Sequence, residues 1–452
     1  MLRRRTAQFL LGVSMLVFRV PEDSWIHGPG AFSAAAGEIT TAFDPLEFLA
    51  EEPDAEPPEE TFGAWSAALL PRWVKATDER IGDPTVSYKD PEFAPGAPLI
   101  TWQDEVGRIW ICAYNQRTGD LIPQDGRGLS PGVGVPIFSP FTSSLTRIGT
   151  NNGPEWGHSR RGYSVFFMQG NRTLGYRVSR YGLRDRSLTT VTPEGVPVAA
   201  GAFASVDSRD PLERLLYGRL VDPRSNNQLI AGEWLNLGTA DPPVRFPVDR
   251  IGTAGPRWIV GERAIMTTKF DADGISQIAR YDIDSGETTL LTGGPGNKFD
   301  GFFIRAPEQL GRRVLCCVID QTRVAFYRPP KRSETTWQLL RELTPPLEAV
   351  DGEMIRATGI APFVYRGRSY VTYLATLTRF NARICLASLD GSINTVISEA
   401  TPENRFDPEV LITQGRLFVY YWIGRQTEAE VEQLRRISLR IYPAAWLPLS
   451  PR

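Results

Sequence analysis

The sequence predicts an all-β protein built from a repeated unit, and three observations support this fold class. Glycine and proline, at 41 and 36 of 452 residues, interrupt the chain often enough to favour many short elements over long helices. Segments 314–319 and 417–422 are apolar at successive positions, as expected of strands that are covered on both faces. Similar segments also recur along the chain, which is typical of a fold assembled from equivalent modules.

Composition limits the class of protein and its partners. Hydrophobic residues make up 42% of the chain and charged residues 23%, which is enough for a large core and argues against a mainly disordered protein. The 50 basic and 52 acidic side chains leave a net charge of −2, so we expect no general attraction to nucleic acid. No segment of the folded body resembles a transmembrane helix.

The amino terminus, residues 1–36, has two of the three parts of an export signal. Three arginines at positions 3–5 precede an apolar run at 7–18, which is too short for a membrane span of about 20 residues. The small residues nearest to a cleavage site lie at 33–36. We interpret 1–36 as a signal or membrane-anchor segment of a periplasmic, secreted or anchored protein. The alternative is a cytoplasmic protein with a disordered start.

Residues 37–61 form an acidic, proline-rich stretch. Between positions 44 and 60 there are eight acidic residues, four prolines and no Lys or Arg. Like-charge repulsion and proline together predict a solvated linker, so the folded domain is expected to span 62–452. If the protein is a scaffold, the stretch 19–61 is the part that would recruit a partner.

A repeat runs through the folded domain. Asn297-Lys-Phe-Asp-Gly and Asn404-Arg-Phe-Asp-Pro each lead into an apolar segment, a Gly-Arg turn and a strand. The aligned copies centre on Pro91, Pro154, Pro211, Pro256, Gly301, Pro362 and Pro408. Their mean spacing of about 53 residues is close to that of β-propeller blades. We therefore predict seven four-stranded blades, or six if the weak copy at Pro211 is an elaborated loop. Two β-sandwiches are the main alternative.

A second motif marks hairpins. Tyr114-Asn-Gln-Arg-Thr-Gly-Asp and Tyr281-Asp-Ile-Asp-Ser-Gly-Glu share an Asx residue, a hydroxyl residue, a glycine and an acid. Glycine supplies the positive φ of a tight turn, and the Asx and hydroxyl side chains bond to the turn backbone. Both segments are therefore predicted to join two strands.

These motifs carry a resemblance to a known repeat. Gly153-Pro-Glu-Trp before a turn and strand, together with the segment 281–292, resembles the TolB-type, WD40-like β-propeller repeat over residues 80–445. The chain departs from the usual Ser-Pro-Asp-Gly turn, with Gly157-His-Ser-Arg-Arg-Gly in its place. The resemblance implies an architecture and no particular function, because unrelated proteins share this repeat.

Cysteine and histidine restrict the possible chemistry. The four cysteines are not spaced as a thiolate metal site, and we expect them to be buried in strands, with Cys316 and Cys317 on opposite faces. The two histidines, His27 and His158, are too few for a site with several imidazole ligands. No phosphate-binding loop or dinucleotide fingerprint is present. We therefore expect neither a metal site nor a cofactor.

Acidic residues recur where each repeat would approach the axis of a propeller. These residues are Asp83, Asp90, Glu92, Glu155, Asp300, Asp407 and Glu409, and Arg257 occupies the position of Glu155 in its own copy. In one interpretation each acid bonds to the backbone of its own turn. In the other, the acids form a ring that binds a cation or a polyol, or cleaves a glycosidic bond.

Within this ring we separate catalytic candidates from ligand-binding candidates. Asp90, Asp300 and Asp407 are the first catalytic candidates, and the ligand-binding candidates are Asp83, Glu92, Glu155, Arg257 and Glu409. Glycosidases need two carboxyl groups about 5–5.5 Å apart for retention or about 6.5–9.5 Å apart for inversion. His158 is a further candidate, as the base of a polysaccharide lyase with Arg160 and Arg161 nearby; a solvated turn residue is the alternative.

The sequence thus favours a non-catalytic β-propeller that binds a protein or carbohydrate partner at its axial channel, outside the cytoplasm. The alternative is a carbohydrate-active enzyme, a glycoside hydrolase before a polysaccharide lyase. The absence of a complete catalytic motif in the sequence supports the first hypothesis, and the acidic ring keeps the second open.

Overall fold

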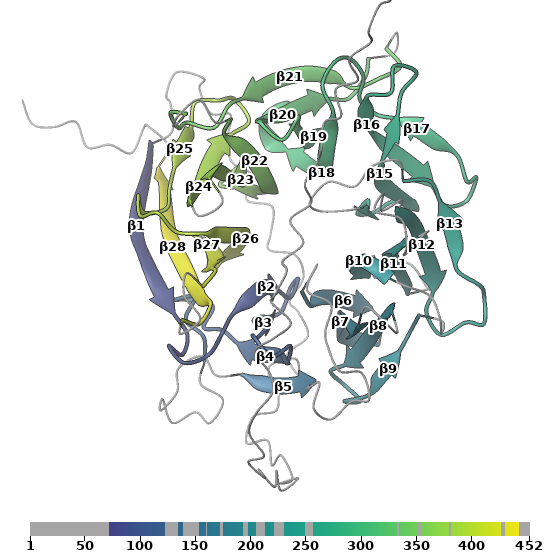
Figure 1. Cartoon of the computed structure of the whole chain (residues 1–452). Helices are drawn as coiled ribbons and strands as arrows, with labels where there is room; N and C mark the ends of the chain where they lie inside the picture. The colour runs from purple at the N-terminus through teal and green to yellow at the C-terminus, as the bar shows by residue number, and fades with distance from the viewer. Residues whose placement is uncertain are drawn as a thin grey trace, which may run out of the picture. The chain divides into compact units, whose positions relative to one another are not determined.

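Short antiparallel sheets account for the regular structure of the computed structural model (Figure 1). The structure describes residues 72–122, 134–138, 153–159, 161–171, 175–192, 198–204, 213–220, 230–248, 256–331, 334–349, 354–378, 381–425 and 430–442. The predicted signal or anchor segment 1–36 and the acidic linker 37–61 lie outside these ranges. Within them, no helix has the length and apolar character needed to cross a membrane.

Seven four-stranded sheets form a ring. We call each sheet a blade and number the blades 1 to 7 in the order in which their innermost strands occur along the chain. Blade 1 contains β2 (Lys89–Phe93), β3 (Leu99–Gln103), β4 (Ile109–Ala113) and β5 (Val135–Phe138). Blade 2 contains β6 (Glu155–Ser159), β7 (Gly162–Asn171), β8 (Gly175–Gly182) and β9 (Leu188–Thr190). Blade 3 contains β10 (Val198–Ala204), β11 (Arg214–Leu220), β12 (Ile230–Asn236) and β13 (Val244–Phe246).

The remaining blades follow the same order from the axis outward. Blade 4 contains β14 (Arg257–Trp258), β15 (Ala264–Phe270), β16 (Ser276–Asp282) and β17 (Thr288–Leu290). Blade 5 contains β18 (Lys298–Ala306), β19 (Arg312–Ile319), β20 (Arg323–Arg328) and β21 (Gln338–Leu343), with the 3-10 helix η3 (Pro307–Gln309) between its first two strands. Blade 6 contains β22 (Arg356–Tyr365), β23 (Arg368–Thr378), β24 (Asn381–Ser388) and β25 (Asn394–Val396).

Blade 7 closes the ring with strands from both ends of the domain. It contains β26 (Arg405–Thr413), β27 (Arg416–Ile423), β28 (Gln433–Tyr442) and, as its outermost strand, β1 (Arg72–Ile81). The purple β1 lies along the yellow β28 in Figure 1, and the two strands pair antiparallel. The predicted seven-bladed β-propeller is therefore confirmed, and both the six-blade reading and the two-sandwich alternative are wrong.

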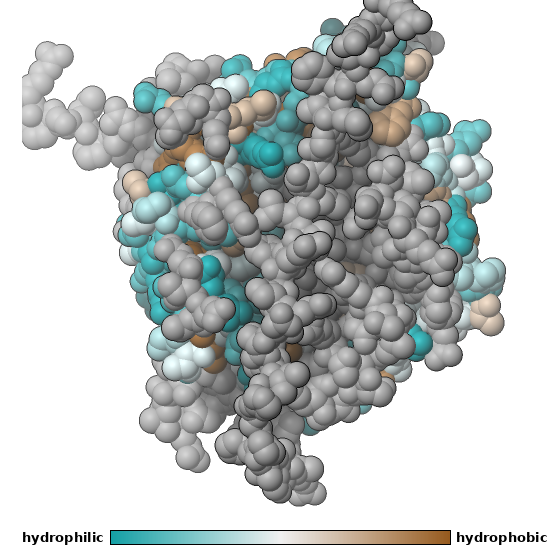
Figure 2. Space-filling view, in the orientation of Figure 1, coloured by the Kyte–Doolittle hydropathy of each residue, from teal (hydrophilic) through white to brown (hydrophobic). Residues whose placement is uncertain are grey.

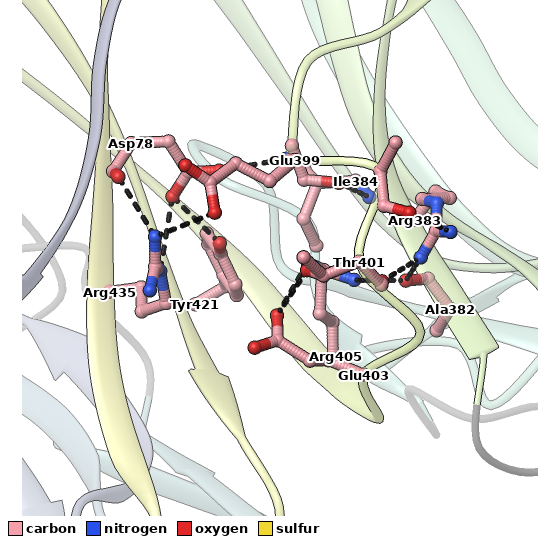
Figure 3. A network of polar contacts seen from close by, with 12 residues as sticks. Asp78, Ala382, Arg383, Ile384, Glu399, Thr401, Glu403, Arg405, Tyr421 and Arg435 are labelled. Carbon is pink, nitrogen blue, oxygen red and sulfur yellow. Dashed lines mark hydrogen bonds and ion pairs between the residues drawn. The ribbon is translucent and has the colours of Figure 1, made fainter.

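A buried ion pair fastens this closing strand. The Asp78 carboxylate on β1 accepts hydrogen bonds from the Tyr421 hydroxyl at 2.8 Å and the Arg435 Nε at 3.2 Å (Figure 3). Its second oxygen accepts the backbone N–H of Glu399, in the connection from blade 6, at 2.8 Å. Asp78 thus ties the amino-terminal strand to its own blade and to the preceding connection.

Apolar side chains fill the spaces between blades. Among the described residues, seven clusters of buried hydrophobic residues each join two neighbouring blades. Cys316 packs toward blade 6 and Cys317 toward blade 4, as the alternation of a strand predicts. All four cysteines are buried and free. Hydrophilic residues cover most of the described surface over β1 and β28 (Figure 2).

The hairpin motifs form the predicted turns. Asn115 Oδ1 accepts the backbone N–H groups of Arg117 and Thr118, at 2.9 and 3.2 Å. Asp282 Oδ1 accepts two backbone N–H groups in the same way, each at 3.0 Å. Gly119 and Gly286 have φ values of 75° and 73°, which glycine adopts without steric cost.

Two aligned repeat positions were wrong. The innermost strand of blade 3 is β10, which precedes Pro211, so Pro211 does not lead into an innermost strand; it lies outside the described residues. In blade 6 the backbone irregularity is at Gly359, so Ile360 rather than Pro362 corresponds to Pro91. Blade 6 keeps the Gly367-Arg turn but has Gly359-Ile360 in place of the Asp-Pro pair of blades 1 and 7.

Candidate functional site

Four innermost strands carry the same backbone irregularity. In β2, β18, β22 and β26 the pairing with the next strand shifts, and one residue in each shift has a positive φ. These residues are Asp90 at 52°, Asp300 at 53°, Gly359 at 56° and Asp407 at 54°. Glycine and aspartate tolerate the left-handed region better than most residues. Pro91 and Pro408 follow two of them and need no ladder hydrogen bond at a bulge.

In each of these four blades, regular pairing with the second strand resumes two residues after the residue with positive φ. Blades 2 and 4 start their innermost strands at this same position, directly after a proline. The residues there are Glu92, Glu155, Arg257, Phe302, Ala361 and Glu409, for blades 1, 2, 4, 5, 6 and 7. Three adjacent blades, 7, 1 and 2, therefore contribute acids, whereas blades 4 and 5 contribute an arginine and an aromatic ring.

Five carboxyl groups from these three blades form what we call the acid arc: Asp407 and Glu409 from β26, Asp90 and Glu92 from β2, and Glu155 from β6. Carboxylate oxygens of Asp90, Glu92 and Asp407 all lie within 4.8 Å of one another. Oxygen ligands around a Ca²⁺ ion at about 2.3–2.6 Å have such separations, so these three residues could hold a hard cation. Acidic groups also cluster without a bound ion, so the spacing by itself identifies no metal.

Glycine makes room for the acid arc at the boundary between blades 1 and 2. The backbone N–H of Gly153 donates a hydrogen bond to Asp90 Oδ2. A Cβ atom at Gly153 would lie 2.5 Å from the Asp90 Cβ and 2.6 Å from its Oδ2. A side chain at this position would therefore collide with Asp90, so the glycine is required for the close approach.

The electrostatics of the acid arc favour protonation or a bound cation. Burial raises the pKa of Glu92 well above its ordinary value, and the neighbouring carboxylates, first Glu409 and then Glu155, raise it further. Asp407 has a raised pKa from burial, from repulsion by Asp90 and from a hydrogen bond with the Asp90 carboxyl. Burial and the charge of Asp90 raise the pKa of Glu409 to about 7, against the attraction of Arg257.

Arg257 faces these acids from blade 4. Its guanidinium carbon lies 3.7 Å from the centroid of the Phe302 ring on blade 5, in a cation–π contact. Burial lowers the pKa of Arg257, while attraction by Asp300 opposes this effect. Asp300, on blade 5, is 6% exposed and attracts Arg257 more strongly than any other carboxylate, and it is not among the charges that raise the pKa values of the acid arc.

Two predicted site residues lie elsewhere. Asp83 precedes β2 and bonds locally, accepting the backbone N–H of Thr85 at 2.8 Å and the Thr85 hydroxyl at 2.6 Å, as the structural interpretation predicts for a turn residue. His158 is three residues from Glu155 on β6, so its side chain projects from the opposite face of the strand. Its ring stacks on Tyr163 at 4.2 Å, and burial lowers its pKa. The structure brings neither residue to the acid arc.

Sequence reasoning named the acids and Arg257 but missed two residues of the site. Gly153 was visible in Gly153-Pro-Glu-Trp, yet only the contact with Asp90 shows why a glycine is needed there. Phe302 lies two residues after Asp300, as Glu92 lies two after Asp90. This alignment could have placed Phe302 at the position equivalent to Glu92.

No protein-family model matches the chain, and no curated protein matches it. Solved structures do. Trypanosoma rangeli sialidase is 13% identical over 63% of this chain, with a TM-score of 0.41; the match covers 54% of the sialidase, so the chain spans about half its length. The β-propeller domain of Myceliophteria thermophila Cps50 (Swd1) is 11% identical, with 80% of this chain and 99% of that domain covered and a TM-score of 0.48.

A third solved structure, from a study of two prolyl endopeptidases, is 12% identical, with 80% of this chain and 50% of that chain covered and a TM-score of 0.45. Identities this low show no function. The fold assignment therefore rests on the strand order of this chain itself, which is that of a seven-bladed β-propeller.

Proposed function

We propose that this protein is a non-catalytic binding propeller whose acid arc captures a positively charged side chain of a partner protein. The observation that carries the proposal is the imbalance of charge: five carboxyl groups from blades 7, 1 and 2 face one guanidinium, that of Arg257. A cluster of charges of one sign attracts the opposite charge.

The ligand class follows from the number of acceptors. Lysine offers three N–H donors and arginine five, and each can bond to several carboxylates at once. A neutral polyol would leave the repulsion within the acid arc unrelieved, whereas a cation would lower the pKa of every acid around it. The expected TolB-type repeat and the expected export signal agree with a binding propeller outside the cytoplasm, and both are part of this proposal.

Calorimetric titration tests the proposal directly. The probes are blocked tripeptides Gly-Lys-Gly and Gly-Arg-Gly, with the uncharged Gly-norleucine-Gly as the control ligand. We expect the cationic peptides to bind at low ionic strength and to bind less tightly as salt is added. Glu92→Gln should weaken binding about tenfold, since one close charge pair at an intermediate dielectric is worth about 1–2 kcal/mol.

Glu105→Gln is the matched control variant, because Glu105 is an exposed acid in the turn after β3 and lies outside the acid arc. It should bind as the wild type does. If the norleucine peptide binds equally well, or if Glu105→Gln and Glu92→Gln weaken binding alike, the acid arc is not the binding site.

A glycoside hydrolase is the second candidate, and one observation favours it. A carboxyl with a pKa of about 7 suits a general acid, and Glu409 has this value beside other carboxyl groups. Hydrolysis of a glycan panel that is lost in Glu409→Gln and in Asp90→Asn, with folding intact, would replace the binding proposal. If the wild type hydrolyses no glycan on the panel, the hydrolase candidate fails.

A further inference from the structure

Arg257 occupies an unusual place in the proposed binding site. The position that holds an acid in blades 7, 1 and 2 holds this arginine in blade 4, so a fixed positive charge already faces the acid arc. Carboxylates from four blades attract its guanidinium: Asp300 most strongly, then Glu155, Glu409 and Glu92. The chain therefore supplies its own cation to a site that is suited to bind one.

A second residue attracts the same guanidinium toward blade 5. The Phe302 ring, from the adjacent blade 5, lies 3.7 Å from the guanidinium carbon, and Asp300 lies two residues before it on β18. Blade 5 thus competes with the acid arc for Arg257. The face of an aromatic ring attracts a guanidinium. The ring carries no net charge, so it attracts a free cationic ligand less strongly than the carboxylates do.

We propose that Arg257 is a tethered counter-ion of the acid arc, that a cationic ligand binds in competition with it, and that Phe302 holds it aside. This inference rests on the proposed function and adds the residue that sets the affinity of the site. Removing the tethered charge should strengthen ligand binding. Removing the ring should weaken it, because Asp300 alone then holds the guanidinium on the side of blade 5 against the attraction of the acid arc.

The two substitutions at touching residues are therefore expected to act in opposite directions. Arg257→Gln should tighten binding of the blocked Gly-Lys-Gly peptide by about tenfold, as expected when a competing charge at a few ångströms is lost. Phe302→Leu, which keeps an apolar side chain in the packing between blades 5 and 6, should weaken binding by about threefold to tenfold. Arg257→Lys keeps the charge, so it should not tighten binding as Arg257→Gln does.

Calorimetric titration of the full chain at pH 8.5 and low salt measures these affinities, and the alkaline pH limits competing protonation of Glu409. Arg263→Gln is the matched control. It removes one positive charge from the same blade, but Arg263 is exposed and paired with Asp284 at 2.6 Å, away from the acid arc. Thermal unfolding of each variant shows whether it is folded.

The outcomes separate this inference from the proposed function. A purely structural role for both residues predicts that Arg257→Gln and Phe302→Leu weaken binding together, which would overturn the inference. Equal strengthening by Arg257→Gln and Arg263→Gln would also overturn it, since the effect would then reflect net charge alone. If the wild type and Arg257→Gln both fail to bind any cationic probe, the proposed function itself is wrong.

Discussion

Asp90 and Asp407 occupy the same bulge position in the first and the last blade, and oxygens of their carboxyl groups lie within 4.8 Å of each other across the boundary between these two blades. They are separated by more than three hundred residues in the sequence. Two carboxyl groups can share a hydrogen bond only when one of them is protonated. Closure of the propeller therefore brings together two carboxyl groups whose mutual repulsion is relieved when Asp407 is protonated.

Replacing Glu409 should change how stability depends on pH. Its pKa is about 7 in the folded protein and lower in the unfolded chain, so the folded state binds more protons between these values. Stability from this group is present below the unfolded pKa and is lost as the pH rises toward 7. Glu409→Gln should therefore raise the free energy of unfolding at pH 8 by about 1–3 kcal/mol.

Urea denaturation between pH 4.5 and 8.5 measures this effect. Glu334→Gln is a control that should lower, rather than raise, the free energy of unfolding at pH 8. The hydrogen bond from Arg328 lowers the pKa of Glu334 to about 2. Its contribution is present above the unfolded pKa and is lost as the pH falls toward 2. A Glu409→Gln protein that is no more stable than the wild type at pH 8 would contradict the assignment of this pKa.

Gly153→Ala should destabilise the boundary between blades 1 and 2. The new methyl group would lie 2.5 Å from the Asp90 Cβ, and both are held by backbone, so one strand must shift. Overpacking of this kind costs about 1–3 kcal/mol. Chemical denaturation measures the loss, and Gly293→Ala is the control, since its new methyl group would have no neighbour closer than 4.0 Å. Equal losses of stability in Gly153→Ala and Gly293→Ala would contradict the close contact between Gly153 and Asp90.

The sequence was sufficient to predict the blades because their signals are local. The turns around Asn115 and Asp282 are specified by side chains that bond within a few residues, and the apolar strands between them indicate burial on both faces. The third blade was counted, but its innermost strand was misplaced, because the expected motif at Pro211 does not lead into β10. A repeat alignment cannot place the innermost strand of a blade whose motif has been lost.

The candidate site was only partly predictable, because its contacts join distant parts of the chain. The recurring Asp-Pro segments pointed to Asp90 and Asp407, but the same pattern at Asp83 leads to a local turn with Thr85. The difference is the backbone: Asp90 and Asp407 have a positive φ within a bulge, and Asp83 does not. Sequence offers no direct measure of φ, so the three acids looked equivalent.

The four cysteine thiols should react slowly in the folded protein. Burial raises the pKa of Cys112 and Cys385 to about 12, and it raises the pKa of Cys316 and Cys317 as well. The thiolate is the reactive form, so few thiols are reactive at pH 8. We expect less than one thiol to react promptly with a disulfide reagent under native conditions. Four should react in denaturant, and rapid native labelling would contradict the burial.

Asp78→Ala should weaken the closure of the ring. The Asp78 side chain is 1% exposed and pairs with Arg435, whose side chain is 15% exposed. Its loss leaves a largely buried guanidinium with the backbone carbonyl of residue 78 at 2.8 Å and the Glu399 carboxylate at 3.3 Å as its remaining partners. Breaking a buried pair by removing one partner costs about 3–5 kcal/mol. Glu79→Ala, on the same strand, removes a pair whose acid is 44% exposed and should cost less than about 1 kcal/mol. Urea denaturation of the two variants tests whether closure depends on Asp78, because equal costs would mean that strand pairing alone holds β1 in place.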